Sequence, residues 1–395
     1  MRILFASNPA LGHVLPLLPL ASVARDAGHE VVVLGGRSLA RAVESAGLTH
    51  VVAGPDDLGS AFARVPGREG LTGRRLAVAT WSGVFAGLIA GQMADAALGL
   101  AETWRPDLVV HEDSEQGTWL AAERLGVPHV SLQATAWRGL LVRLSASPIG
   151  ALRERLGLPP DPALERWHRH GYLTTRPAAL RDPADPMPRT TIPIRPSAVD
   201  DLDGIAPAWL ATGDAPRTRP RVAVTLGTIL PGRLDTMSAI LDGLAQLDVD
   251  VVATVGPGLD PAALGERPSR IRVERYVPMS RLLPASDAVV YHAGSGTMLA
   301  AVASGLPTVL LPVNADQPDN AARCVAAGIG VEVSEGARTP AAIRDATMAA
   351  LGDPAFRAAA ARVRAELEAM PAPEVVLPRL ERLAALGPDG SLLES

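Results

Sequence analysis

Short runs of apolar and β-branched residues alternate along the chain with longer stretches rich in Ala and Leu. The short runs are typical of buried strands in a parallel sheet, and the longer stretches are typical of the helices that connect such strands. The first half predicts strands at 2–6, 30–34, 108–110 and 129–132, with helices that include 14–26 and 116–125. The second half predicts strands at 221–225, 249–255, 271–273, 288–291 and 308–311. The pattern therefore predicts an α/β fold with two doubly wound, Rossmann-like domains that face a central cleft.

A segment rich in Pro, Asp and Arg separates the two halves, at about 175–220. Because Pro interrupts both helices and strands, we expect a linker here, with a hinge near 196–220. We place the first domain at 1–205 and the second at 206–373. A C-terminal helical stretch, 374–395, follows Pro371-Ala372-Pro373, and the sequence leaves open whether it packs back on the first domain.

Composition narrows the class of protein. A chain of 395 residues, 48% of them hydrophobic, is long enough for two buried cores. A net charge of -5 gives no electrostatic argument for binding nucleic acid or an anionic membrane. All 37 basic residues are Arg, which excludes a catalytic lysine. Cys324 is the only cysteine and the apolar runs are short, so we expect no disulfide, no stable membrane insertion and a cytoplasmic protein.

The densest group of candidate binding residues follows the predicted strand 288–291. It reads His292-Ala293-Gly294-Ser295-Gly296-Thr297 and leads into an Ala-rich helix. Such a turn directs several backbone N–H groups and a helix N-terminus at one small volume, which suits a phosphate. Asp316 and Gln317 follow the next strand, at the same edge of the sheet, and a carboxylate and an amide suit sugar hydroxyls. The combination predicts a nucleotide-sugar site.

The turn after the first predicted strand is a second candidate site. Gly12-His13 lies between strand 2–6 and a helix, so His13 is close to a helix N-terminus at the carboxyl edge of the sheet. The helix dipole there favours a neutral imidazole, which can accept a proton. Glu112 and Asp113 follow strand 108–110, and either carboxylate can orient the imidazole. Spacing alone leaves the choice between them open.

Taken together, the motifs resemble in order and spacing the inverting nucleotide-sugar glycosyltransferases of the GT-B fold, in particular the bacterial branch that decorates polyketides and other natural products. The resemblance covers Met1 to Val333. Its motifs are Gly12-His13, Tyr276-Val277-Pro278, the segment 292–297, Gly305-Leu306-Pro307 and the segment 316–321.

The resemblance implies an enzyme with His13 as general base. His13 would deprotonate an acceptor hydroxyl, which attacks the anomeric carbon while the nucleoside diphosphate leaves. Glu112 matches the partner acid, although relatives often have Asp there, and Asp113 is adjacent. No cofactor or metal is implied, because N–H groups and a helix dipole would meet the leaving-group charge. The partners implied are a nucleotide sugar and a small-molecule aglycone, and the sequence is compatible with a homodimer.

The resemblance also assigns the donor-binding residues. Tyr276 would stack on the pyrimidine, and the backbone of Val277 would contact the base edge. Asp316 and Gln317 would hold the sugar. The residues that match the diphosphate cradle or its flanking turns are Gly12, Thr228, His292, Gly294, Ser295, Gly296 and Thr297.

One position departs from the uridine-binding members of this family. They often carry Glu eight residues after the phosphate-binding His, where it binds both ribose hydroxyls, and this chain has Ala300 there. Because Ala cannot form those hydrogen bonds, the sequence favours a thymidine diphosphate donor with a deoxysugar over a uridine diphosphate donor.

Each candidate also has a structural interpretation. Glu112 and Asp113 can cap the following helix, and Tyr276 can be a packing residue. We interpret four further histidines of the first half as structural, namely His111, His129, His168 and His170. Trp81, Phe85 and Trp137 are candidates for contact with an apolar acceptor, although large aromatic residues are core residues by default. The segment 53–80 predicts a mobile loop on the acceptor side.

Other functions compete with transfer. Gly294-Ser295-Gly296 starts like a dinucleotide fingerprint but lacks its third Gly, which argues against a dehydrogenase. Asp201-Leu202-Asp203 and Asp248-Val249-Asp250 match the Asp-x-Asp of metal-dependent transferases but have no further ligands nearby. A nucleotide-sugar epimerase or hydrolase of the same fold, and a catalytically silent activator subunit, remain as alternatives.

Overall fold

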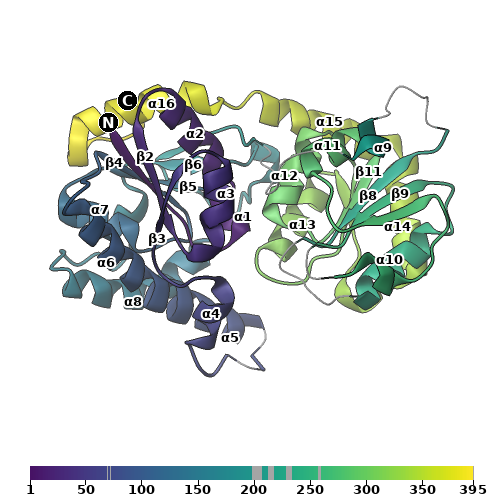
Figure 1. The fold of residues 1–395 in the computed structure, drawn as a ribbon, viewed down its shortest axis with the longest axis horizontal. Coiled ribbons are helices and arrows are strands. Elements are labelled where there is room, and N and C mark those ends of the chain that lie inside the picture. The colour runs from purple at the N-terminus through teal and green to yellow at the C-terminus, as the bar shows by residue number, and fades with distance from the viewer. Residues whose placement is uncertain are drawn as a thin grey trace. The chain divides into compact units, whose positions relative to one another are not determined.

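The computed structural model describes residues 1–68, 70–71, 73–197, 207–211, 218–227, 234–256 and 259–394. The chain forms two compact units, each with its own parallel sheet (Figure 1). The first unit comprises Met1–Thr175, Asp182–Asp201 and Pro371–Ser395, and the second comprises Arg176–Arg181 and Leu202–Met370. The predicted boundary at 205/206 and most of the predicted hinge at 196–220 lie outside the described residues.

The first sheet has seven strands in the order β3-β2-β1-β4-β5-β6-β7, and all its neighbours pair in parallel. The strands are β1 Arg2–Ala6, β2 Glu30–Gly35, β3 Thr49–Val52, β4 Leu108–Glu112, β5 His129–Leu132, β6 Tyr172–Thr174 and β7 Thr191–Pro193. The four predicted strands are confirmed. The prediction of a linker throughout 175–220 is wrong at β7, which pairs with β6 as an edge strand and so tolerates its terminal proline.

Helices pack on both faces of this sheet. Alternate residues of β1 point to opposite faces of the sheet and so enter different cores. Ile3 and Phe5 pack with helix α2 (Leu18–Asp26), whereas Leu4 and Ala6 pack with the long helix Arg75–Ala101. The α-helices of this unit are α1 Leu11–Val14, α2 Leu18–Asp26, α3 Ala40–Ser45, α4 Leu58–Ala63, α5 Gly73–Val78, α6 Ala90–Ala101, α7 Thr118–Leu125, α8 Gly139–Arg155 and α16 Pro373–Leu386, and a π-helix spans Ala79–Ile89.

The segment 53–80 is not a loop throughout, and that prediction is wrong. It contains α4 and α5, and it ends inside the π-helix. Asp57 and Ser60 form a capping box that starts α4, a local signal that is independent of hydrophobic periodicity. Phe62 and Val65 then pack against the core, which holds the segment on the sheet.

One helix among the described residues, Arg75–Ala101, is long and apolar enough to cross a membrane, and 44% of its most apolar window is buried. Phe85, Ile89 and Met93 from this helix lie in the same core as Leu4 and Val109 of the sheet. Core helices meet the same criteria of length and composition, so this helix is weak evidence for a membrane span.

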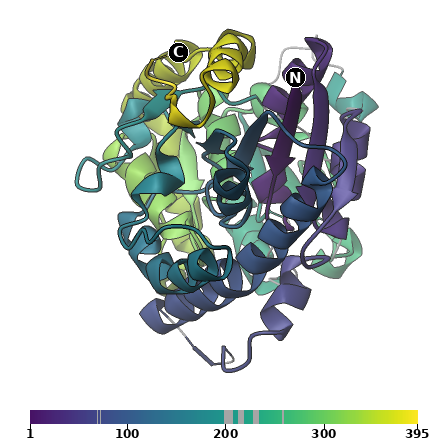
Figure 2. The ribbon, with the colours of Figure 1, turned by 90° about the vertical axis from the view of Figure 1, so that its left-hand side faces the viewer.

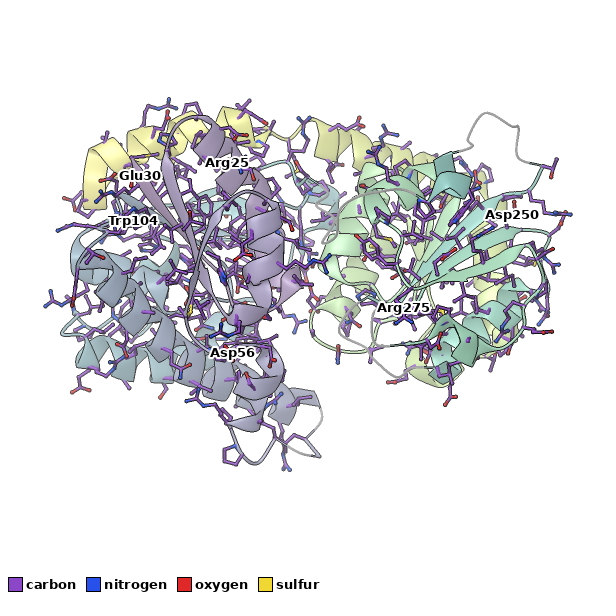
Figure 3. All side chains as sticks on the ribbon, viewed as in Figure 1. Arg25, Glu30, Asp56, Trp104, Asp250 and Arg275 are labelled. Atoms are coloured by element: carbon purple, nitrogen blue, oxygen red, sulfur yellow. The ribbon has the colours of Figure 1, made fainter. Side chains whose placement is uncertain are left out.

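The C-terminal helix α16 belongs to the first unit. Its residues Val376, Leu380 and Leu383 are buried in the core that contains β1 and α2. His29 Nε2 lies 2.9 Å from the Glu381 carboxylate, and Leu392 N–H donates to His170 O at 2.7 Å. Figures 1 and 2 both show this yellow helix beside the purple N-terminal elements. Trp104 and Glu30, both labelled in Figure 3, also belong to this unit, and Trp104 Nε1 donates to the Glu30 carboxylate at 3.1 Å.

The second sheet has six strands in the order β10-β9-β8-β11-β12-β13, again parallel. The strands are β8 Arg221–Thr225, β9 Asp250–Thr254, β10 Ile271–Glu274, β11 Ala288–Tyr291, β12 Thr308–Leu310 and β13 Gly330–Glu332. The helices are α9 Ala208–Ala211, α10 Leu234–Leu244, α11 Met279–Leu282, α12 Ser295–Ala303, α13 Gln317–Ala326, α14 Pro340–Gly352 and α15 Pro354–Glu368. The five strands predicted in this half are confirmed.

Both sheets reverse their strand order at one point, as doubly wound sheets do. The reversal falls between β1 and β4 in the first sheet and between β8 and β11 in the second. Ligands bind outside the carboxyl ends of the strands at such a switch point. The residues that follow β1, β4, β8 and β11 are therefore the first candidates for chemistry.

Candidate active site

His13 and Glu112 meet at the switch point of the first sheet. Glu112 is the last residue of β4, and His13 lies in the short helix after β1. His13 Nδ1 is 3.0 Å from Glu112 Oε1. The His13 side chain is 14% exposed and that of Glu112 is fully buried. Gly12 is exposed, with open space where a Cβ would lie, so the turn leaves room beside the imidazole.

Backbone and side-chain donors hold the Glu112 carboxylate in place. Ser114 N–H donates to Oε2 at 2.7 Å, and Asn8 N–H donates to Oε1 at 3.3 Å. Ser114 Oγ is 2.9 Å from Oε1 and 3.0 Å from His13 Nδ1, and it accepts from Asn8 Nδ2 at 3.0 Å. Burial favours a higher pKa for Glu112, but the charge and hydrogen bond of His13 and the bonds from Ser114 outweigh it, so the pKa is lowered. Glu112 is therefore ionised at neutral pH.

Asp113 points to different partners. Its carboxylate accepts from Tyr172 Oη at 2.8 Å and from Ala134 N–H at 3.1 Å. Burial and the nearby charge of Glu112 raise the pKa of Asp113 to about 7. Of the two carboxylates that the sequence offered, Glu112 contacts His13, whereas Asp113 contacts the tyrosine of β6.

Four histidines form a buried group behind this dyad. His111 Nδ1 lies 3.1 Å from Glu112 O, and its Nε2 lies 3.2 Å from Ser131 Oγ. Ser131 Oγ is in turn 2.8 Å from His168 Nδ1, while the rings of His129 and His170 meet edge to face at 4.6 Å. Burial lowers the pKa of His111 to about 4. These imidazoles are packed and neutral, as the structural interpretation of the sequence expected.

The π-helix places aromatic side chains next to His13. The ring centroids of Phe85 and His13 are 6.2 Å apart, and those of Trp81 and Phe85 are 5.1 Å apart. π-Helical segments are uncommon and often mark functional sites. Trp137, the third aromatic candidate for acceptor contact, packs instead against His168 and Tyr172.

His292 lies at the switch point of the second sheet, between two glycines. A Cβ on Gly227 would be 2.6 Å from His292 Cε1, and a Cβ on Gly294 would be 2.4 Å from its Nε2. Gly227 also has φ +73°, which side chains rarely adopt. Burial lowers the pKa of His292 to about 4, against the opposing effect of the Asp316 charge. His292 is therefore a neutral hydrogen-bonding group at pH 7.

Helix α12 begins three residues after this histidine, and its N-cap residue, Gly294, has no side chain that could cap it. Ser295 is its first residue, Gly296 is exposed with open space at its Cβ position, and Thr297 is partly exposed. Ala293 has φ 64°, a left-handed conformation that is strained for alanine. The N–H groups of the first turn and the helix dipole make this a site suited to an anion.

Asp316 and Gln317 lie close to this helix start but are already hydrogen-bonded. Ser295 Oγ donates to Asp316 Oδ2 at 2.5 Å. The side chain of Gln317 bonds to the backbone of the loop that precedes it. Its Oε1 accepts from Val313 N–H at 2.9 Å and from Asn314 N–H at 3.3 Å. Ala315, before this pair, is again left-handed with φ 55°. The structure thus brings Asp316 to the candidate phosphate site and uses the Gln317 amide to shape the loop.

Two residues without a predicted role join the same network. Asn320 is fully buried and its Nδ2 donates to Ala293 O at 2.8 Å and to Asp316 Oδ2 at 3.1 Å. Arg176 Nη2 donates to Ser295 Oγ at 2.7 Å. Asn320 belongs to the 316–321 motif, so the sequence carried a signal for it. Arg176 lies in the Pro-rich segment after β6, where no pattern distinguished it.

The structure describes three of the four remaining donor-site candidates, Tyr276, Val277 and Ala300. Tyr276 and Val277 follow β10; Val277 is fully buried in the core, and Tyr276 is partly exposed. Ala300 packs against the core on α12. Thr228 lies outside the described residues. Within the described parts of the chain, no group of three or more His, Cys, Asp or Glu side chains could hold a metal ion.

Comparison with known proteins places the chain in a family. Residues 23–227 match the N-terminal domain of the erythromycin biosynthesis protein CIII-like family, and residues 238–383 match its C-terminal domain. The chain is 34% identical to the L-demethylnoviosyl transferase of Streptomyces niveus, across 95% of this chain and 96% of that protein. It is 31% identical to the aklavinone 7-beta-L-rhodosaminyltransferase of Streptomyces galilaeus, across 98% and 96% of the two chains.

Solved structures show the same architecture. The glycosyltransferase SnogD from Streptomyces nogalater aligns with a TM-score of 0.80 at 32% identity, covering 97% of this chain and 99% of that one. VinC in complex with dTDP aligns with a TM-score of 0.82 at 26% identity, covering 98% and 100%. The spinosyn rhamnosyltransferase SpnG with spinosyn aglycone aligns with a TM-score of 0.80 at 25% identity, covering 96% and 100%. The chain therefore belongs to the erythromycin biosynthesis protein CIII-like family and is a glycosyltransferase of antibiotic biosynthesis with the two-domain GT-B fold.

Proposed function

We propose that this enzyme transfers a deoxysugar, with inversion, from a thymidine diphosphate donor to a hydroxyl group of a natural-product aglycone. The observation that carries the proposal is the pair His13 and Glu112, with Nδ1 and Oε1 3.0 Å apart, at the switch point of the first sheet. Relatives include a 10-deoxymethynolide desosaminyltransferase and an aclacinomycin-T 2-deoxy-L-fucose transferase, and the second of these supports a deoxysugar donor.

In the proposed mechanism, His13 Nε2 removes the acceptor proton. Glu112 accepts a hydrogen bond from Nδ1–H, which leaves Nε2 with its lone pair available. As the acceptor oxygen attacks the anomeric carbon, the bond from that carbon to the diphosphate oxygen breaks on the opposite face. The proton passes to Nε2, and the ionised Glu112 stabilises the imidazolium. One displacement of this kind inverts the anomeric configuration.

The second unit would bind the donor. The uncapped first turn of α12 and the neutral His292 supply N–H groups toward the diphosphate, and the helix dipole stabilises the charge that develops on the leaving group. We assign the base-stacking role to Tyr276 and the sugar-binding role to Asp316, with Gln317 shaping the loop. Thr228, Ser295, Gly296 and Thr297 complete the proposed cradle.

The preference for thymidine over uridine rests on Ala300. The methyl side chain of Ala300 cannot form a hydrogen bond with the 2′-hydroxyl of a ribose. A 2′-deoxyribose has no hydroxyl at this position, so its binding leaves no hydroxyl without a hydrogen bond. The complexes of VinC with dTDP and of SsfS6 with thymidine diphosphate are in keeping with such a donor. A homodimer, a cytoplasmic location and independence from metals remain predictions from the sequence.

The test compares the parent enzyme with His13→Ala and His50→Gln. Release of the nucleoside diphosphate, thymidine or uridine according to the donor, is measured in the presence of a panel of polyketide aglycones, with matched thymidine and uridine deoxysugar donors. We expect His13→Ala to lower kcat at least about 100-fold, in the range of general-base catalysis, with donor binding retained. His50, whose ring contacts Gly35 O in the same unit, is the matched control and should leave kcat unchanged.

Unchanged turnover in His13→Ala would remove this residue from the mechanism. Donor hydrolysis that does not depend on an aglycone would favour a hydrolase, and a uridine preference would overturn the donor assignment.

A further inference from the structure

A buried guanidinium lies beside the proposed diphosphate site. Only 4% of the Arg176 side chain is exposed, and its Nη2 donates to Ser295 Oγ at 2.7 Å. The same nitrogen is 3.8 Å from Asp316 Oδ2. Ser295 is the first residue of α12, so the cation lies at the helix end where the donor's phosphates are proposed to bind.

Hydrogen bonds within the second unit hold the backbone at and after Arg176 in place. Arg181 donates to Arg176 O from Nε at 3.0 Å and from Nη2 at 2.9 Å. Ala179 N–H donates to Glu366 at 3.0 Å, and Leu180 is buried in the core of the second unit. Burying a charge costs free energy unless the protein compensates it, and the Asp316 carboxylate, 3.8 Å from Arg176 Nη2, contributes to that compensation.

Charge explains why a cation is needed at this place. The hydroxyl of Ser295, the first residue of α12, connects two charged groups. It donates to the Asp316 carboxylate and accepts from the Arg176 guanidinium, so the negative charge of Asp316 lies next to the start of α12. His292 contributes no positive charge, since burial lowers its pKa to about 4. A diphosphate brought next to Asp316 without compensation would meet a like charge at low dielectric, which disfavours binding.

We propose that Arg176 is a donor-site residue that compensates Asp316 and positions Ser295. Its charge lets the sugar-binding carboxylate and the anionic diphosphate occupy adjacent places. The inference rests on the proposed donor function. It adds a cation that is not part of helix α12 and that favours binding of the phosphates by offsetting the charge of Asp316.

Equilibrium binding of thymidine, thymidine monophosphate and thymidine diphosphate tests the inference. In the parent enzyme, affinity should rise with each phosphate. In Arg176→Met, we expect affinity for thymidine diphosphate to fall about tenfold or more, as for loss of a charge-assisted interaction, while affinity for thymidine stays within about twofold. Arg176→Lys keeps the charge without the planar fork and should recover part of the loss.

The double variant Arg176→Met/Asp316→Asn separates charge compensation from a structural role. Removing the carboxylate removes the repulsion, so thymidine diphosphate should bind the double variant more tightly than it binds Arg176→Met, by at least about threefold. This variant removes both members of the charge pair between Arg176 and Asp316, and it provides the measurement if Arg176→Met fails to fold. Arg267→Met is the control, because Arg267 lies in the same unit, is 15% exposed and donates to Leu264 O at 3.0 Å, away from Arg176; it should keep the parent ratio of diphosphate to nucleoside affinity.

Three results would overturn the inference: an unchanged affinity of Arg176→Met for thymidine diphosphate, an equal weakening of its affinity for all three ligands, or no recovery in the double variant. If the parent binds thymidine diphosphate and one of these results follows, only the role of Arg176 falls. If the parent binds none of the three ligands, the proposed donor function falls with it.

Discussion

The Glu112 carboxylate depends on Ser114 for its orientation. A glutamate side chain has one methylene more than an aspartate and so has more rotational freedom to restrict. Ser114 restricts it from both its backbone N–H, at 2.7 Å from Oε2, and its hydroxyl, at 2.9 Å from Oε1. Asn8 adds a backbone bond at 3.3 Å. This arrangement holds the longer side chain of Glu112 in one orientation, with Oε1 3.0 Å from His13 Nδ1.

Ser114→Ala should therefore lower kcat roughly tenfold with little change in donor KM, because about 1.4 kcal/mol of a charged hydrogen bond is lost while the backbone donors remain. Steady-state kinetics with a saturating aglycone measure the effect. Ser145→Ala is the matched control, since Ser145 is equally buried in the same unit and bonds only within α8, to Leu141 O at 3.0 Å. Equal kinetics for the two variants would show that Ser114 does not position the dyad.

At the residue scale, the sequence predicted that His13 lies near a carboxylate after β4, because the topology of a doubly wound sheet places the residues after β1 and β4 together. It left open the choice between Glu112 and Asp113, since consecutive residues at a strand end point to different sides, and only the fold shows which side holds His13. Arg176 was not predictable, because its role depends on where the chain crosses into the second unit after β6, and no local pattern encodes that crossing.

At the scale of elements, two tight turns fix His292. The turn after β8 passes within contact distance of the ring through Gly227, and the start of α12 does so through Gly294. Neither turn can carry a side chain without moving the imidazole. The glycines thus matter for the anion site because of the close approach as well as the backbone conformation.

Gly227→Ala should weaken binding of thymidine diphosphate about tenfold or more, because its Cβ would lie 2.6 Å from the His292 ring and displace it. Gly265→Ala is the control: Gly265 has nearly the same φ, +71°, but nothing within 4 Å of its Cβ position. Both variants carry the strain of an alanine at positive φ, about 1 kcal/mol or more in unfolding free energy. Calorimetric titration should find the binding loss only in Gly227→Ala, and a similar loss in both would contradict the steric explanation.

The longer elements were predictable, and the short or irregular ones were not. Strands such as β1 and β11 are apolar runs buried on both faces, which the pattern reveals directly. In contrast, β7 spans only Thr191–Pro193 at a sheet edge, where register with β6 makes the strand. The π-helix Ala79–Ile89 has no sequence signature of its own, because its hydrogen bonding differs from that of an α-helix while its composition does not.

At the scale of the whole molecule, the groups with shifted pKa values are unevenly distributed. Burial lowers the pKa of His170 to about 4 and that of His129 and His168 well below 6.5, and all three lie in the first unit with His111. Burial likewise raises the pKa of Glu115 to about 7, alongside Asp113. Among the described residues of the second unit, one histidine, His292, has a pKa that is lowered by burial, to about 4.

These shifts have opposite effects on stability as the pH falls. A histidine whose pKa is depressed in the folded state contributes its full stability above pH 6.5, and it loses that stability as the pH falls toward 4, because the unfolded chain binds the proton first. A carboxyl whose pKa is raised takes up its proton first in the folded state, so it adds stability as the pH falls from 7. Near pH 5, four buried histidines outweigh Asp113 and Glu115, and the ionised Glu112 works in the same direction as the histidines.

We therefore expect acidification from pH 8 to pH 5 to destabilise the first unit more than the second, seen by calorimetry as a larger fall in the transition temperature assigned to the first unit. His129 offers the sharpest test, because neither of its ring nitrogens has a hydrogen-bond partner among the described residues. His129→Phe should fold, and its unfolding free energy should depend less steeply on pH between 6.5 and 5, by about 1.4 kcal/mol per pH unit for the one proton removed. A variant that folds yet keeps the parent's pH dependence would show that the imidazole of His129 does not resist protonation in the native protein.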